Sequence, residues 1–152
     1  MWRGTKTKET PGHKWFSISA DGGRTLQPVG EWKYADGSSF FSPSSIHQFF
    51  RHSVNGKLYW IGNISDTPPK GNAPRYPLFI AEIDEANIAL RKDTLMTIDA
   101  RGPSDTAELQ LSNFTVLEDR ETKQLEIYLT RYGEHADNIN HADAYKYKLS
   151  FK

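Results

Sequence analysis

The amino-acid sequence predicts an all-β fold for the whole chain. Short runs of β-branched and aromatic residues recur along its 152 residues, and turn residues separate them. Helical periodicity is nearly absent. Aromatic residues make up 12% of the chain, a share that suits both strands and surfaces that stack on sugars. The length suits one domain.

The first predicted hairpin joins a strand at residues 15–19 to a return strand at 29–34. Between them the octapeptide 19–26 reads Ser-Ala-Asp-Gly-Gly-Arg-Thr-Leu. This spacing is typical of a tight turn, and an ordinary Asp-Gly-Gly hairpin is one interpretation of it.

Side chains within the octapeptide can hold such a turn closed. The Asp21 carboxylate can accept backbone N–H bonds, while Gly22 or Gly23 takes a positive φ. We expect the hydroxyls of Ser19 and Thr25 to bracket the turn with further hydrogen bonds.

The middle of the chain predicts four antiparallel strands. Strands at 46–52 and 58–64 are joined by an Asn-Gly turn. Strands at 78–83 and 95–98 pair through the connection at 84–92.

Three more strands follow. A strand at 114–117 pairs through the charged turn 118–123 with a strand at 125–130, and the last strand covers 145–151. In that last strand the aromatic and aliphatic side chains alternate with lysines, which predicts one buried and one solvent-facing side.

The octapeptide resembles the Asp-box of sialidase-type β-propellers, with Leu26 in place of the family's closing Trp. The resemblance implies a partial propeller of about two and a half four-stranded blades from a six- or seven-bladed parent. Residues 1–34 would end one blade, 46–98 would form a full blade, and 112–152 would form the last blade without its outer strand. It also implies that the following residues are the structural residues of the box: Ser19, Asp21, Gly23 and Thr25.

This register predicts that the chain is the C-terminal part of a longer sialidase-like protein. A small self-contained β-sandwich is the alternative. Open sheet edges in such a part of a propeller predict self-association.

Composition excludes several classes of partner and chemistry. Nineteen basic residues balance nineteen acidic ones without a basic run, which argues against nucleic acid or an anionic membrane as a partner. The chain has no cysteine, so disulfides and thiol chemistry are excluded. It shows neither a membrane-span run nor an export signal of its own, and the compartment stays open, although the resemblance implies a periplasmic or extracellular parent.

The resemblance places the substrate at the end of the propeller opposite the Asp-boxes. In the predicted register that end carries the loops at 3–14, 35–45, 65–77, 99–112 and 131–143. These loops are long, contain Pro or Gly and are rich in Arg, His, Asp and Asn. Long loops on a rigid scaffold are common places for binding residues.

Sialidases hold the substrate carboxylate with three arginines and use a Tyr paired with a Glu as nucleophile. Planar guanidinium groups match a carboxylate, and an uncharged phenol does not repel an anionic sugar. The family's nucleophile lies near the inner strand of the last blade, where residues 109–114 hold no tyrosine. Tyr132 and Glu134, on the following loop at 131–143, offer a different Tyr/Glu pair at a position that departs from the family's, and they are the catalytic candidates. The substrate-binding candidates are Arg3, Arg75, Arg101, Arg131 and His135.

The expected function is that of a sialidase-like carbohydrate-active protein whose parent hydrolyses terminal acidic sugars from glycans. A glycan or acidic sugar is thus the expected partner, and the chain alone is expected to be inactive. A polysaccharide lyase and a non-catalytic glycan-binding propeller are the alternatives.

No cofactor is expected. The repeated tripeptides at 135–137 and 141–143, each His-Ala-Asp, offer imidazoles and carboxylates that can bind metals. Their spacing matches no strong metal signature, so the sequence assigns no metal site.

Overall fold

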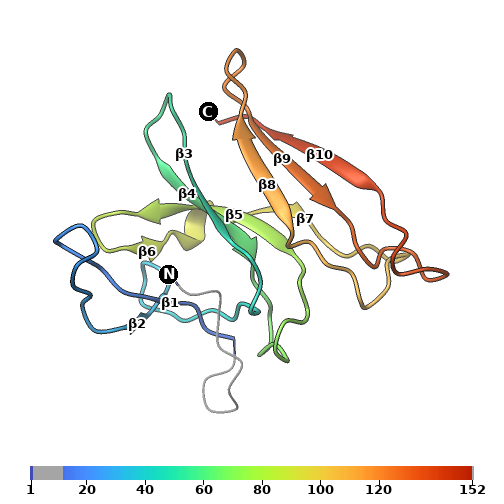
Figure 1. Cartoon of the computed structure of the whole chain (residues 1–152), viewed down its shortest axis with the longest axis horizontal. Helices are drawn as coiled ribbons and strands as arrows, with labels where there is room; N and C mark the ends of the chain where they lie inside the picture. The colour runs from blue at the N-terminus through green and yellow to red at the C-terminus, as the bar shows by residue number, and fades with distance from the viewer. Residues whose placement is uncertain (2–11, 152) are drawn as a thin grey trace.

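The computed structural model describes Met1 and residues 12–151, and this part of the chain is all-β. Figure 1 shows three antiparallel sheets, none of which closes on itself. The described residues form ten strands and one short 3-10 turn, η1 (Lys92–Thr94), without an α-helix. In this part of the chain, no helix is long and apolar enough to cross a membrane.

The first sheet is the predicted first hairpin, made of β1 (Trp15–Phe16) and β2 (Gly30–Glu31). The regular strands are shorter than predicted, but backbone pairing extends beyond them. Gln27 N donates to the Ile18 carbonyl at 2.9 Å, and Trp32 N donates to the Lys14 carbonyl at 2.8 Å.

The middle sheet contains the predicted four strands in chain order. They are β3 (Gln48–Arg51), β4 (Leu58–Asn63), β5 (Leu78–Asp84) and β7 (Met96–Asp99), each antiparallel to the one before it. A two-residue strand that the sequence did not predict, β6 (Ala89–Leu90), pairs with the end of β5.

The third sheet is a three-stranded meander in the order β8, β9, β10. Its strands are β8 (Phe114–Glu118), β9 (Leu125–Thr130) and β10 (Ala144–Leu149), as the sequence predicts. In Figure 1 the β3–β4 and β8–β9 turns point to the same end of the molecule, and the long loops after β4 and β9 lie toward the other.

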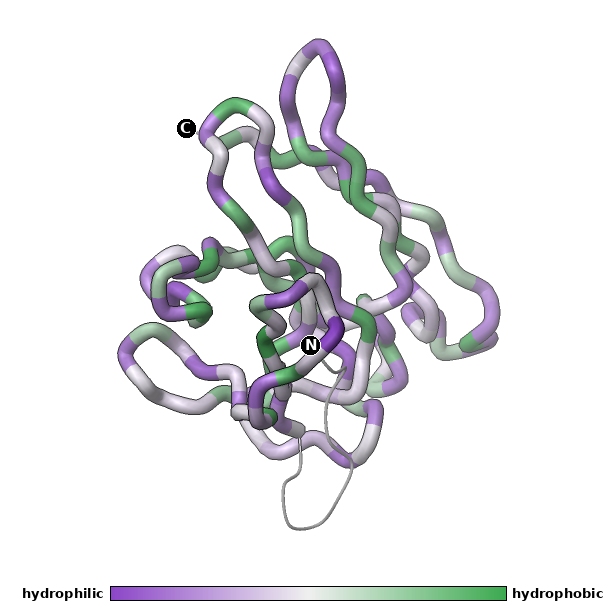
Figure 2. The backbone as a smooth tube through the Cα atoms, turned by 60° about the vertical axis from the view of Figure 1, so that its left-hand side comes forward, coloured by the Kyte–Doolittle hydropathy of each residue, from purple (hydrophilic) through white to green (hydrophobic). Residues whose placement is uncertain are grey.

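The middle sheet packs on both faces, because its side chains alternate between two hydrophobic cores. Tyr59 and Ile61 of β4 face the core shared with the third sheet, whereas Trp60 faces the core that contains Trp32. Trp60 has no exposed surface and is therefore a core residue. Figure 2 shows the resulting alternation of hydrophobic and hydrophilic residues along the strands.

Side-chain hydrogen bonds also connect the middle and third sheets. Gln48 Nε2 donates to the Phe114 carbonyl at 2.7 Å, and Ser53 Oγ donates to Glu118 Oε1 at 2.6 Å. The two sheets are therefore joined by polar contacts as well as by their common core.

Asn63, at the end of β4, ties the loop before β5 to the segment before β8. It is fully buried, and its Nδ2 lies 3.0 to 3.1 Å from the carbonyl oxygens of Arg75, Pro77 and Leu111. One side chain thus sets the relative position of two of the long loops.

Candidate functional site

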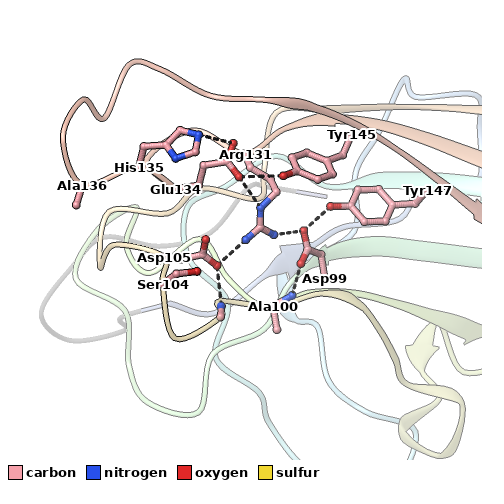
Figure 3. Close-up of a pocket in the computed structure, with 11 residues that line it drawn as sticks. Asp99, Ala100, Ser104, Asp105, Arg131, Glu134, His135, Ala136, Tyr145 and Tyr147 are labelled. Atoms are coloured by element: carbon pink, nitrogen blue, oxygen red, sulfur yellow. Dashed lines mark hydrogen bonds and ion pairs between the residues drawn. The ribbon is translucent and has the colours of Figure 1, made fainter.

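The loops at 99–112 and 131–143 meet at an open pocket of about 580 Å³ (Figure 3). The strand β10 forms one wall of this pocket. Its ionisable lining residues are Asp99, Asp105, Arg131, Glu134, His135, Tyr145 and Tyr147.

Arg131 follows β9 directly and forms the centre of the pocket. Its guanidinium donates from Nε to Glu134 Oε2 at 3.0 Å, from Nη2 to Asp105 Oδ2 at 2.5 Å, and from Nη1 to Asp99 Oδ2. Only 9% of the residue is exposed. Three carboxylates share this one guanidinium, so the four side chains together carry a formal net charge of −2.

Burial alone would lower the pKa of Arg131. Hydrogen bonds to Asp99 and Asp105 more than offset this effect, and the pKa lies above its ordinary value. The guanidinium is therefore a fixed positive charge at every pH at which the protein is folded.

Two tyrosines of β10 reach the same cluster, because residues two apart on a strand share a face. The Tyr145 hydroxyl donates to Glu134 Oε2 at 3.3 Å, and the Tyr147 hydroxyl donates to Asp99 Oδ2. The guanidinium carbon of Arg131 lies 5.5 Å from the centre of the Tyr145 ring.

Both phenols remain protonated donors at neutral pH. Burial, followed by the hydrogen bond to Asp99, raises the pKa of Tyr147. Burial, followed by the negative charges of Glu134 and Asp143, raises the pKa of Tyr145.

Backbone N–H groups hold two of the carboxylates from the opposite side. Gly102 N donates to Asp105 Oδ2 at 2.7 Å, and Ala100 N donates to Asp99 Oδ1 at 2.7 Å. Burial opposes ionisation of Asp105, but the Gly102 N–H and Arg131 hold its pKa below its ordinary value. Asp105 is thus a carboxylate, and an acid too strong to serve as a proton donor at neutral pH.

Gly133 allows the loop at 131–143 to pack closely against the loop at 99–112. Its φ is +80°, and a Cβ at this position would lie 2.5 Å from the Glu108 carbonyl oxygen. Thr106 Oγ1 donates to the Gly133 carbonyl at 2.5 Å. A glycine is therefore required for the close approach that forms the pocket.

The structure brings Glu134, Arg131 and His135 into this pocket but does not pair Tyr132 with Glu134. The Tyr132 hydroxyl donates to Asn140 Oδ1 at 3.0 Å. The left-handed Gly133 between the two residues turns the chain, so that Glu134 faces Arg131 and takes Tyr145 as its phenol partner.

Arg75 lies in a neighbouring cluster rather than in the pocket. Its Nη1 donates to Gln110 Oε1 at 2.8 Å, and its Nε donates to the Asn72 carbonyl at 3.1 Å. Gln110 also bridges to Tyr132 through the backbone, so this cluster borders the loop of the Arg131 pocket.

Arg101, another predicted substrate-binding arginine, is not among the described residues that line the Arg131 pocket. Arg101 Nε donates to the Thr106 carbonyl at 2.9 Å, and its guanidinium carbon lies 5.9 Å from the centre of the Tyr76 ring. Arg3 lies outside the described residues.

Sequence reasoning missed Asp99, Asp105, Tyr145 and Tyr147. The alternation along β10 was a usable signal for the two tyrosines, since it put both on one face. The two aspartates gave no such signal, because they meet Arg131 only where the middle sheet and the loop after it pack against the third sheet.

In Figure 1 the turn at 19–26 and the loops at 99–112 and 131–143 lie on opposite sides of the molecule. Asp21 Oδ1 accepts from Thr25 N at 2.9 Å, Asp21 Oδ2 accepts from Thr25 Oγ1 at 2.7 Å, and Ser19 Oγ accepts from Gly23 N at 2.7 Å. These are the contacts expected from the spacing. Leu26 is 64% exposed and does not seat the turn on the neighbouring sheet.

The Thr25 N–H, the Thr25 hydroxyl and the Ser19 hydroxyl lower the pKa of Asp21 from 3.8 to about 2. The turn is therefore held by a carboxylate that stays ionised well into the acid range.

Comparisons with protein-family models, with curated proteins and with solved structures find no match to this chain. The fold and the site geometry are thus the basis of any functional inference.

Proposed function

We propose that the chain belongs to a sialidase-like, carbohydrate-active β-propeller and that the pocket around Arg131 forms part of its glycan site. In this proposal the β3–β4–β5–β7 meander is one blade, β8–β10 are three strands of the next blade, and β1–β2 is the outer hairpin of the preceding one. The packing of the middle sheet on both faces supports this assignment, because a blade contacts a neighbour on each side.

The observation that carries the proposed function is the pocket itself, a group of carboxylates and phenols at the long-loop end of the molecule. Carboxylates accept hydrogen bonds from sugar hydroxyls, and aromatic rings offer apolar faces for the sugar ring. Oriented polar groups in an aromatic-walled pocket are typical of carbohydrate recognition.

The hydrogen bond between Tyr145 and Glu134 supports a hydrolytic role. In this role Glu134 takes the phenol proton as the Tyr145 oxygen bonds to the anomeric carbon, and the glycosidic bond breaks with its oxygen leaving as an alcohol that takes a proton from solvent. Water then attacks the anomeric carbon and breaks its bond to the Tyr145 oxygen, Glu134 returns its proton to the phenol, and the proton of the water passes to solvent. The raised pKa of Tyr145 requires the proton to leave during the attack rather than before it.

The second candidate function is glycan binding without catalysis. Its support is that both carboxylate oxygens of Glu134 are already engaged, Oε2 by Arg131 and Oε1 by the Asp143 N–H at 2.7 Å. Glu134 then serves as a hydrogen-bond acceptor that holds the pocket wall in place, which is all that glycan binding requires of it.

The charge of the pocket bears on the choice of sugar. With a formal net charge of −2 on Arg131 and its three carboxylates, this pocket favours the hydroxyl or amino groups of a sugar over its carboxylate. For an acidic sugar, we therefore assign the carboxylate to the side of Arg75 and Arg101.

The test is glycan binding by the chain, measured by saturation-transfer NMR with sialyllactose and with lactose, beside a fluorogenic sialoside assay. We expect saturable binding that Tyr145→Phe and Glu134→Gln weaken. Tyr128→Phe is the matched control, since Tyr128 is an exposed phenol on β9 that donates to Glu126. Sialoside turnover that Glu134→Gln abolishes would establish catalysis and overturn the expectation that the chain alone is inactive. Binding without turnover would support a glycan site under either candidate function, and absence of binding to either glycan would refute both.

A further inference from the structure

The loop at 131–143 gathers three side chains that can bind a metal ion. One ligand atom each from Glu134, His135 and Asp143 lies within 4.8 Å of the others. Glu134 is buried, His135 is partly exposed and Asp143 is exposed, so this set faces solvent at the rim of the pocket. An ion can therefore enter without a change of fold.

Backbone hydrogen bonds hold the loop in this arrangement. Arg131 N donates to the Asp143 carbonyl at 3.1 Å, and Gly133 N donates to the Ile139 carbonyl at 3.1 Å. Asp143 N donates to Glu134 Oε1 at 2.7 Å, which joins two of the three residues directly. Because the residues are already in place, little conformational entropy is lost when an ion binds.

A second imidazole lies beside the three residues. The ring centre of His141 is 5.4 Å from that of His135. An ion held by the first three residues would thus have another nitrogen donor in its neighbourhood, with water as the alternative fourth ligand.

The electrostatics of the site favour a cation. Arg131 is shared among Asp99, Asp105 and Glu134, and Asp143 adds a further carboxylate at the rim. A divalent ion would neutralise most of this excess negative charge. His135 Nε2 already lies 3.7 Å from Glu134 Oε1, a spacing that an ion between the two atoms can bridge.

We propose that Glu134, His135 and Asp143 bind a zinc ion at the rim of the Arg131 pocket, with His141 as the neighbouring donor. Imidazole and carboxylate together suit zinc, whereas calcium and magnesium prefer oxygen ligands alone. Zinc would clamp the two ends of the loop and stabilise the pocket wall. This inference does not depend on the proposed glycan function.

The experiment is isothermal titration calorimetry of the chelator-treated chain with zinc chloride. We expect one zinc ion per chain, with affinity reduced at least roughly tenfold by His135→Gln and by Asp143→Asn. Asp137→Asn is the matched control, because Asp137 is an exposed acid in the same loop outside the ligand set. The zinc affinity of this variant should equal that of the unmodified chain. Excess calcium should not displace the zinc.

NMR spectra of each variant show whether the fold persists, and shifts of the His135 ring signals on zinc addition locate the ion. Absence of saturable zinc binding would overturn the proposal, and so would binding that survives both His135→Gln and Asp143→Asn. Because zinc binding is measured without sugar and glycan binding can be measured without zinc, failure of one proposal is distinguishable from failure of the other.

Discussion

At the scale of single residues, Arg131 decides the shape and charge of the pocket. Its guanidinium collects Asp99 from the end of β7, Asp105 from the following loop and Glu134 from its own turn. An arginine so engaged is an organiser of carboxylates, which differs from the expected role of a clamp on a substrate's carboxylate. Its removal would leave three negative charges close together and partly desolvated.

We predict that Arg131→Met lowers the free energy of unfolding by about 3 kcal/mol at neutral pH, since a buried ion pair that loses one partner leaves unpaired charge. Urea denaturation followed by tryptophan fluorescence measures the change. Arg120→Met is the control, because Arg120 is exposed in the β8–β9 turn. The loss of unfolding free energy relative to the unmodified chain should become smaller as the pH falls, because the carboxylates protonate. A small loss at neutral pH would contradict the role of Arg131 in holding the carboxylates together.

Asp21 predicts a pH effect in the turn at 19–26. Its pKa is lowered on folding, so its contribution to stability is complete above about pH 4 and is lost as the pH falls through 2. The amide shift of Thr25, followed by NMR, should titrate with a midpoint near 2. Ser19→Ala removes one of the hydrogen bonds and should move that midpoint upward; an unchanged midpoint in this variant would show that the Ser19 hydroxyl does not contribute.

The contrast between Asp21 and Asp99 shows which side-chain contacts can be predicted from the sequence and which cannot. The partners of Asp21 lie two and four residues away, so its hydrogen bonds follow from local spacing alone. The side-chain partners of Asp99 lie 32 and 48 residues away and meet it only after the middle and third sheets have packed together. The Arg131 cluster therefore could not be derived from the chain without its topology.

At the scale of elements, hairpins were predictable and the connections between sheets were not. The strands from β3 to β10 follow the predicted runs closely, because alternation and turn residues are local signals. The exception, β6, forms where the loop after β5 folds back and Arg91 N donates to the Glu82 carbonyl at 2.9 Å. Such a two-residue strand has too few side chains to give a pattern.

We predict that the buried amide of Asn63 stabilises the connection between the loop before β5 and the segment before β8. Asn63→Leu keeps the branched shape of the side chain but leaves the carbonyls of Arg75, Pro77 and Leu111 without their shared donor, which should cost about 3 kcal/mol of unfolding free energy. Urea denaturation measures it, and Asn113→Leu, at an exposed position just before β8, is the control. Equal stability of the two variants would show that the carbonyls find other donors.

At the scale of the whole molecule, the three sheets lie side by side and leave apolar surface open between the first and second. A cleft of about 340 Å³ there is lined by β1–β2 and by the middle sheet. Its apolar side chains include Phe16, Trp32, Phe49, Leu58 and Ile83. Exposed apolar surface of this kind and open strand edges favour association between molecules.

We predict that the chain self-associates as its concentration rises and that Phe49→Lys weakens this association, because Phe49 is 44% exposed at the cleft. Sedimentation velocity at several concentrations measures the effect. Val54→Lys adds the same charge at a position that is 69% exposed in the β3–β4 turn, outside the cleft, and should leave the association unchanged. A chain that sediments as a monomer throughout would refute the prediction.

The turn at 19–26 differs from the pocket in one further respect. The hydrogen bonds of Ser19, Asp21 and Thr25 stay inside the octapeptide, and its last residue is turned to solvent. The turn is therefore held by hydrogen bonds within its own eight residues and needs no contact with the neighbouring sheet. The same turn can form on unrelated hairpins and can persist when the surrounding sequence changes, so its presence carries no information about the chemistry of a distant pocket.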